Sequence, residues 1–202
     1  MKGLTQRAQL LKKQLVSSKR GQFSSLLINF IQENGQSRYD ESVTQTEHAL
    51  QAADLASQSG AEPTLIAAAL LHDIGHLLID EFSERDNFLA VDQCHEIFGA
   101  RFLEPYMPAE LLATIRLHVL AKRYLCSTQE AYIDQLSKSS KRSFELQGGL
   151  LSSEELKTLE SEPYLTSALK IRVWDDQAKV AGKEVPPLNA YANTLAEVYL
   201  PS

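Results

Sequence analysis

Residues 69–78, ALLHDIGHLL, place His72, Asp73 and His76 inside a run that is otherwise apolar. Burying a polar group costs free energy unless the group is paired, and burying a charge costs more unless it is paired or binds a metal. On a continuous helix His72 and His76 would share one face, with Asp73 beside His72. Imidazole and carboxylate groups are common ligands of divalent transition metals. The run therefore indicates a core helix that ends at a metal site, although Asp73 alone could serve as a helix cap.

The chain has five histidines, and each lies on or at the end of a predicted helix in an apolar or amphipathic run. They are His48, His72, His76, His95 and His118. A single histidine on such a helix is more often a core residue whose polar atoms are hydrogen-bonded. Five of them in this setting, with none in a surface tail, favour a metal centre.

Composition narrows the function classes. A chain of 202 residues suits one domain, and its net charge of −6 argues against a nucleic-acid partner. A small anionic substrate is compatible with this net charge, because a few cationic side chains at the site are enough to bind it. The two cysteines, Cys94 and Cys126, predict reduced thiols in a cytoplasmic protein. No apolar run approaches the roughly 20 residues that cross a bilayer, so we expect no membrane association. The sequence leaves the oligomeric state open.

Apolar residues recur at helical spacing along most of the chain, and strand-like alternation is scarce, which predicts an all-α bundle. The expected helices span residues 4–16, 23–35, 43–60, 62–71, 91–106, 109–118, 128–137, 138–146, 151–160, 164–180 and 188–199. Gly21, in KRGQ at 19–22, predicts a helix break. We therefore expect an N-terminal helical extension at 1–22 and a main domain at 23–202.

Six motifs in a fixed order carry a resemblance to a known family. They are YDESVTQTEHALQAA (39–53), AALLHDIGH (68–76), CHEIFGARFL (94–103), HVLAKRYL (118–125), SKSSKRSFELQGG (137–149) and SALKIRVWDD (167–176). The order of His, His-Asp and a later Asp resembles the HD-domain superfamily, an all-α helical bundle. HVLAKRYL and KIRVWDD are more specific, and with them the chain resembles the PhnZ-like mixed-valent diiron oxygenases of organophosphonate catabolism.

This resemblance implies a centre of two iron ions in the Fe(II)/Fe(III) state. Its ligands would be His48, His72, Asp73, His95, His118 and Asp175, with Asp73 bridging the two ions. It also implies that O2 oxidises the carbon of a small 1-hydroxyphosphonate, such as 2-amino-1-hydroxyethylphosphonate. The products would be a carboxylate and inorganic phosphate. The residues expected to act in catalysis are Asp73, His76 and Lys122.

The substrate contacts follow from the resemblance and from helical spacing. Lys122 lies four residues after His118, and Arg172 lies three residues before Asp175, so each would face the ions. A solvated salt-bridging pair is the alternative for these two cations. The resemblance adds His76, Ser140, Ser143 and Gln147 as contacts, although the two serines could instead cap helices. It also assigns Tyr39 to a lid over one iron and Glu41 to a substrate ammonium group, with shorter Tyr–Glu spacing than the family pattern.

Two alternatives stay open. An HD-domain phosphohydrolase would use Mn2+, Mg2+ or Zn2+ to activate water against a nucleotide or another phosphate ester. A non-enzymatic protein would keep the site for stability or for ligand sensing.

Overall fold

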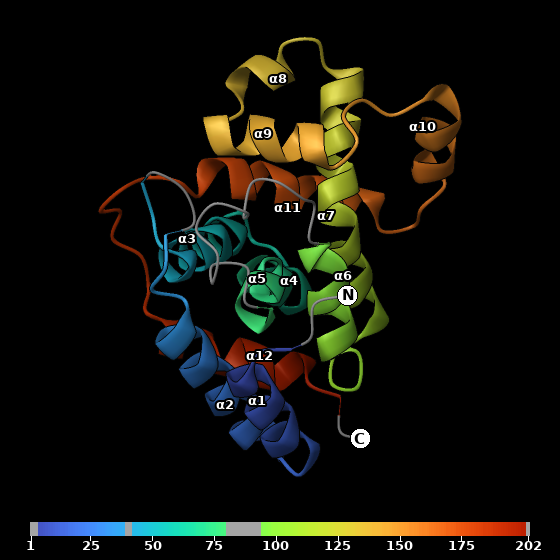
Figure 1. The fold of residues 1–202 in the computed structure, drawn as a ribbon. Coiled ribbons are helices and arrows are strands. Elements are labelled where there is room, and N and C mark those ends of the chain that lie inside the picture. Colours follow the sequence, from blue (N-terminus) through green and yellow to red (C-terminus); the bar gives the residue numbers. More distant parts are fainter. Residues whose placement is uncertain (1–3, 39–41, 80–93, 201–202) are drawn as a thin grey trace.

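The computed structural model describes residues 4–38, 42–79 and 94–200, and across them the chain is helical with no β-strand (Figure 1). This confirms the predicted all-α class. Tyr39 and Glu41 lie outside the described residues. The helices are α1 (Gln6–Val16), α2 (Arg20–Asn34), α3 (Gln45–Gln58), α4 (Pro63–Leu71), α5 (Ile74–Leu78), α6 (His95–Leu103), α7 (Ala109–Thr128), α8 (Tyr132–Gln135), α9 (Lys138–Leu146), α10 (Ser153–Glu160), α11 (Leu165–Gln177) and α12 (Ala192–Val198), with a 3-10 turn at Leu188–Tyr191.

Local sequence explains where the central helices start. The Thr44 hydroxyl caps α3 by accepting a hydrogen bond from the Glu47 N–H at 3.2 Å, and the Glu47 carboxylate accepts one from the Thr44 N–H at 2.7 Å. Pro63 occupies the first turn of α4, where its missing N–H needs no partner. Helices α3, α4, α7 and α11 then pack against one another around the apolar core.

Several expected helix limits are wrong. The helix expected at 164–180 ends at Gln177, and the one expected at 128–137 spans only Tyr132–Gln135. Gly21 lies inside α2, because the following apolar face, with Phe23, Leu27 and Ile31 buried, outweighs the helix propensity that one glycine loses. Helix α7 continues past residue 118 to Thr128, since buried residues such as Leu125 keep the helical spacing. The longer α7 carries Lys122 on the same helix as His118.

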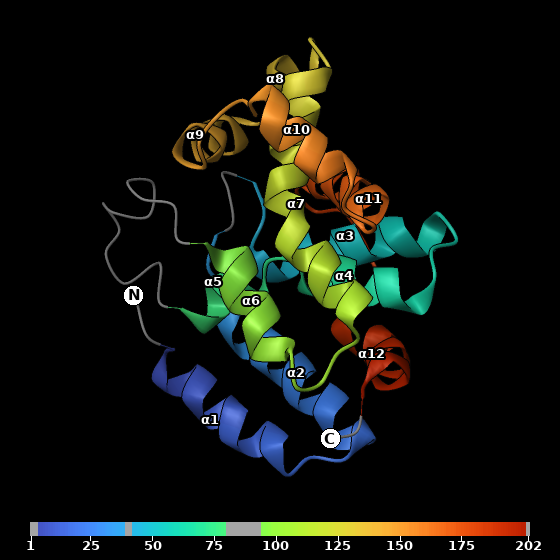
Figure 2. The same ribbon diagram turned by 90° about the vertical axis from the view of Figure 1, so that its right-hand side faces the viewer.

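The two ends of the bundle differ. Helices α1 and α2 lie side by side at one end, and α8 and α9 lie at the opposite end, above α11 (Figures 1 and 2). Leu11 and Leu15 of α1 are buried in the main core. The division into an extension and a domain at residue 22 stays a prediction, and α2 runs across that position. Among the described helices, none combines the length and apolar character needed to cross a membrane.

Candidate metal centre

The His-Asp pair lies in a break between two helices. Helix α4 ends at Leu71 and α5 begins at Ile74. The expectation that His72 and His76 share one continuous helix is therefore wrong. Asp73 stands at the N-cap position of α5, but its side chain makes no capping hydrogen bond. The capping alternative is therefore wrong. The break turns the Asp73 carboxylate into the interior, where it is 7% exposed.

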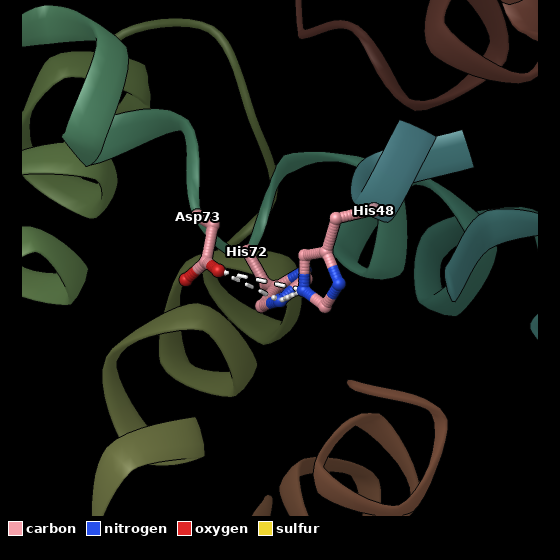
Figure 3. Close-up of side chains that lie close together, drawn as sticks. All are labelled: His48, His72 and Asp73. Carbon is pink, nitrogen blue, oxygen red and sulfur yellow. Dashed lines mark hydrogen bonds and ion pairs between the residues drawn. The ribbon is translucent and has the colours of Figure 1, made fainter. Parts of the chain in front are cut away.

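Each oxygen of this carboxylate faces a different pair of histidines. Asp73 Oδ2 lies 3.3 Å from His72 Nε2 and 3.6 Å from His48 Nε2 (Figure 3). Asp73 Oδ1 lies 3.1 Å from His95 Nε2 and 3.5 Å from His118 Nε2. The four rings come from α3, α6, α7 and the break after α4. One carboxylate thus lies between two histidine pairs, and either group could hold a metal ion.

In three of these histidines a backbone carbonyl group decides which ring nitrogen carries the proton, because a carbonyl oxygen can only accept a hydrogen bond. The Nδ1–H group of His48 donates to the carbonyl oxygen of Ala178 at 2.9 Å. The Nδ1–H group of His72 donates to that of Ala69 at 2.8 Å. The Nδ1–H group of His118 donates to that of Ile115 at 2.7 Å. In the neutral rings, Nε2 is left with a lone pair and no proton. Such backbone contacts orient the ring of a metal-binding histidine.

The Nε2 atoms within each histidine pair lie close together, which calls for a cation near them. His48 Nε2 and His72 Nε2 are 3.2 Å apart, and His95 Nε2 and His118 Nε2 are also 3.2 Å apart. In the first pair both Nε2 atoms carry a lone pair, and two lone pairs at this distance repel each other unless a proton or a metal ion lies nearby. The buried Asp73 Oδ2 has no hydrogen-bond partner within the described part of the chain. The donor set therefore fits a metal ion on each side of Asp73.

Burial keeps three of the histidine ligands in the neutral state that metals require, whereas Asp73 raises the pKa of His72 against the effect of burial. Burial lowers the pKa of His48 to about 4, and it lowers the pKa of His95 to about 3, where His76 adds to the effect. The pKa of His118 is lowered for the same reason. Burial opposes the charged form of Asp73, but the histidines around it, His72 first, hold its pKa well below the usual range.

Asp175 joins the first histidine pair. Its Oδ1 lies 3.4 Å from His48 Nε2, and the side chain is 2% exposed. Burial opposes its ionisation, but Arg172 and Lys179 keep its pKa low. The six residues expected to hold iron therefore lie together. His76 lies beside them, with its ring stacked on His95 at 3.9 Å between centroids and its Nε2 3.9 Å from Asp73 Oδ1.

The two predicted cations are buried against the same site. Lys122 and Arg172 are 4% and 3% exposed, which rules out a solvated surface pair. Lys122 Nζ donates to Ser143 Oγ at 2.7 Å, and burial together with Arg172 lowers the pKa of Lys122 to about 8. Arg172 pairs with both Asp175 and Asp176. These carboxylates overcome the effect of burial and hold the pKa of Arg172 above its usual value.

The two predicted serine contacts on α9 also face this region. Ser137, not Ser140 or Ser143, caps α9, so the capping alternative for these two serines is wrong. Ser140 Oγ accepts a hydrogen bond from Lys179 Nζ at 3.0 Å. Gln147 ends α9, and its buried Oε1 has no hydrogen-bond partner among the described residues.

Sequence reasoning missed three members of this cluster. Lys179 Nζ lies 3.5 Å from Asp175 Oδ1, and Asp176 accepts hydrogen bonds from Arg172 and from Tyr132 Oη. The spacing of four residues, from Arg172 to Asp176 and from Asp175 to Lys179, was the available signal. No local pattern links Tyr132 to α11, because 44 residues separate it from Asp176.

Comparison with known proteins agrees with this geometry. The sequence profile of the HD domain matches residues 46–175, a stretch that includes Asp73 and the five residues around it, and the chain belongs to the HD domain family. Two named relatives align over most of the chain. Hydroxymethylphosphonate dioxygenase of Gimesia maris is 51% identical over 171 residues, which cover 85% of each protein. A [1-hydroxy-2-(trimethylamino)ethyl]phosphonate dioxygenase (glycine-betaine-forming) of Leisingera caerulea is 38% identical over 83% of this chain and 85% of its own.

Proposed function

We propose that this protein is an iron- and O2-dependent oxygenase that cleaves the C–P bond of a small 1-hydroxyphosphonate, giving a carboxylate and inorganic phosphate. The observation that carries the proposal is the position of Asp73, whose two oxygens face two histidine pairs beside a group of buried cations. The names of both relatives support the same reaction class.

Two iron ions would be held by ligands that share Asp73. His48, His72 and Asp175 would complete one site, and His95 and His118 would complete the other. Neutral imidazole and carboxylate donors suit iron as well as Mn2+ and Zn2+, so the donor set alone does not select the metal. The dioxygenase names of the relatives favour iron. Bound iron would supply the electrons and the binding position with which O2 is activated.

The protein would hold the substrate through its buried cations. A phosphonate carries negative charge on oxygens that Arg and Lys bind strongly in a site shielded from water. Lys122 would exchange its contact with Ser143 for a phosphonate oxygen, and Ser140, Gln147 and Arg172 would supply further contacts. His76, beside Asp73, would donate a hydrogen bond to the substrate.

Hydroxymethylphosphonate is the first substrate to test, because the relative that acts on it by name is 51% identical. Its oxidation by one O2 would balance as formate plus phosphate. The aminated compound 2-amino-1-hydroxyethylphosphonate is the second, since Glu41 is proposed to bind an ammonium group and Tyr39 to form a lid. A trimethylammonium analogue completes the set.

The test measures phosphate release from these three compounds by protein loaded with Fe(II), in air and without O2. Release that needs both iron and O2, with 18O from labelled O2 in the carboxylate, is expected. A nucleotide panel with Mn2+, Mg2+ or Zn2+ tests the phosphohydrolase alternative, and hydrolysis there without O2 would replace the proposal. The variant Glu41→Ala should weaken turnover of the aminated compound much more than that of hydroxymethylphosphonate.

A further inference from the structure

Helix α3 contacts the chain after α11 through two side chains that lie one helical turn apart. His48 Nδ1 donates to the Ala178 carbonyl oxygen at 2.9 Å. Gln51 makes two hydrogen bonds to Val180: its Nε2 donates to the carbonyl oxygen at 2.9 Å, and its Oε1 accepts from the N–H at 3.0 Å. Gln51 is 1% exposed, although it contributes to no part of the proposed reaction.

The pairing requires an amide side chain. The backbone of a residue offers one N–H donor and one carbonyl acceptor, and a Gln side chain offers the complementary acceptor and donor. Glutamate could accept from the Val180 N–H but would place a second oxygen against the carbonyl oxygen. An apolar side chain would remove both hydrogen bonds from Val180, which is itself exposed and has to be held in place by such contacts. Residue type at position 51 is therefore constrained by the contact with Val180.

The contact holds a segment that has left its helix. Helix α11 ends at Gln177, so residues 178–180 depend on contacts other than the regular helical pattern. This segment carries the Ala178 carbonyl, which receives the Nδ1–H of His48. It also carries Lys179, whose Nζ reaches Asp175 Oδ1 at 3.5 Å and Ser140 Oγ at 3.0 Å. A shift of the segment would move both contacts together.

We propose that Gln51 is a positioning residue for the metal centre. By fixing Val180 it holds the Ala178 carbonyl against His48 and keeps the proton of that ring on Nδ1, so that Nε2 carries the lone pair that binds a metal ion. The inference rests on the dinuclear centre of the proposed function. Gln51 would support binding of the ion beside His48, His72 and Asp175. It would not affect the ion beside His95 and His118.

The test titrates metal-free protein with Co2+ and follows the visible absorption of each bound ion. Wild-type protein is expected to bind two ions. Gln51→Ala and Gln51→Glu should weaken one of the two by about 10- to 100-fold, the range seen when a group that orients a metal ligand is lost. The other ion should keep its affinity within about twofold. A long-range 1H–15N spectrum of the metal-free protein should show the Nδ1–H form of His48 in the wild type and a mixture of ring forms in Gln51→Ala.

Two control variants separate positioning from general stability. Gln58→Ala removes a hydrogen bond to Asp54 at the far end of α3 and should leave both ions unchanged. Leu195→Ala removes a fully buried side chain of α12 and lowers the melting temperature without touching the centre. Two unchanged Co2+ affinities in Gln51→Ala would overturn the inference. Equal weakening of both ions, matched by Leu195→Ala, would overturn it too. The titrations use no phosphonate, so a failure of the proposed reaction does not affect them.

Discussion

Gly75 packs against the backbone of His95 so closely that no side chain fits between them. A Cβ atom at position 75 would lie 1.9 Å from the His95 carbonyl oxygen. Gly99, one turn further along α6, faces the same point, since its Cβ would lie 3.3 Å from the Gly75 nitrogen. This approach of α5 and α6 brings His95 beside Asp73 and stacks it on His76.

Gly75→Ala should therefore damage both the fold and one half of the metal centre. The methyl group forces α6 away from α5, and overpacking of this kind destabilises by about 1–3 kcal/mol. The ion beside His95 and His118 should be lost before the other ion. Urea unfolding and Co2+ titration measure the two effects. Gly21→Ala is the matched control, because nothing lies within 4 Å of its Cβ and the change should raise stability slightly. Wild-type behaviour of Gly75→Ala would contradict the close approach.

Asp73→Ala should abolish binding of both ions, because each group of ligands depends on this one carboxylate. Iron content after anaerobic loading measures the effect, and phosphate release should fall to background. Asp54→Ala removes another buried carboxylate from α3, bonded to Gln58 and away from the centre, and should keep two irons. Two irons retained in Asp73→Ala would show that the shared ligand is misassigned.

The pH dependence of substrate capture should follow Lys122. Its pKa is about 8, so the side chain is positive below that pH and loses its proton above it. An anionic phosphonate then loses a buried cation, and kcat/KM should fall as pH rises through 8, while kcat at saturating substrate changes less. Lys122→Arg keeps its charge at all these pH values and should lack the decline. A wild-type profile that stays flat to pH 10 would remove Lys122 from substrate binding.

Metal-free protein should lose stability in weak acid. The pKa values of His48 and His95 are about 4 and about 3 in the fold, against 6.5 when the chain is unfolded, so between these values the unfolded chain binds more protons. The free energy of unfolding should therefore decrease as pH falls from 6.5 towards 4, by on the order of 1 kcal/mol per pH unit for each such histidine. His72 does not counteract this loss, because Asp73 raises its pKa against the effect of burial and the stability it gains on protonation is acquired mainly above pH 6.5.

Urea titrations of chelator-treated protein at several pH values measure this slope. The variant His48→Asn should have a shallower slope, since one of the two groups is gone. Loading with Co2+ should flatten the curve near neutral pH, because metal binding competes with protonation. Stability that is constant between pH 6.5 and 4 would contradict the buried, neutral state of these rings.

Helical periodicity was enough to predict the all-α class, and the histidines in apolar runs were enough to indicate a metal centre. The set of six ligands, which includes Asp175, was implied by the resemblance to the diiron oxygenases. The histidines were conspicuous because His48, His72, His95 and His118 each stand at a buried position of a regular helix or at its end, where apolar residues surround them in the sequence. Helix limits were less predictable. Gly21 resembles a helix stop, yet the apolar face of α2 overrides it, and nothing in ALLHDIGHLL marks the break after Leu71.

By itself the sequence determined which residues are polar inside the core and which motifs accompany them, since both are local properties of the chain. Only the tertiary structure decided how these residues meet. The contact of Gln51 with Val180 spans 129 residues, and that of Lys179 with Ser140 spans 39. The approach of Gly75 to His95 likewise depends on how two helices pack. Such contacts have no periodic trace in the sequence, because backbone carbonyls and interhelical distances are set by packing and not by residue type.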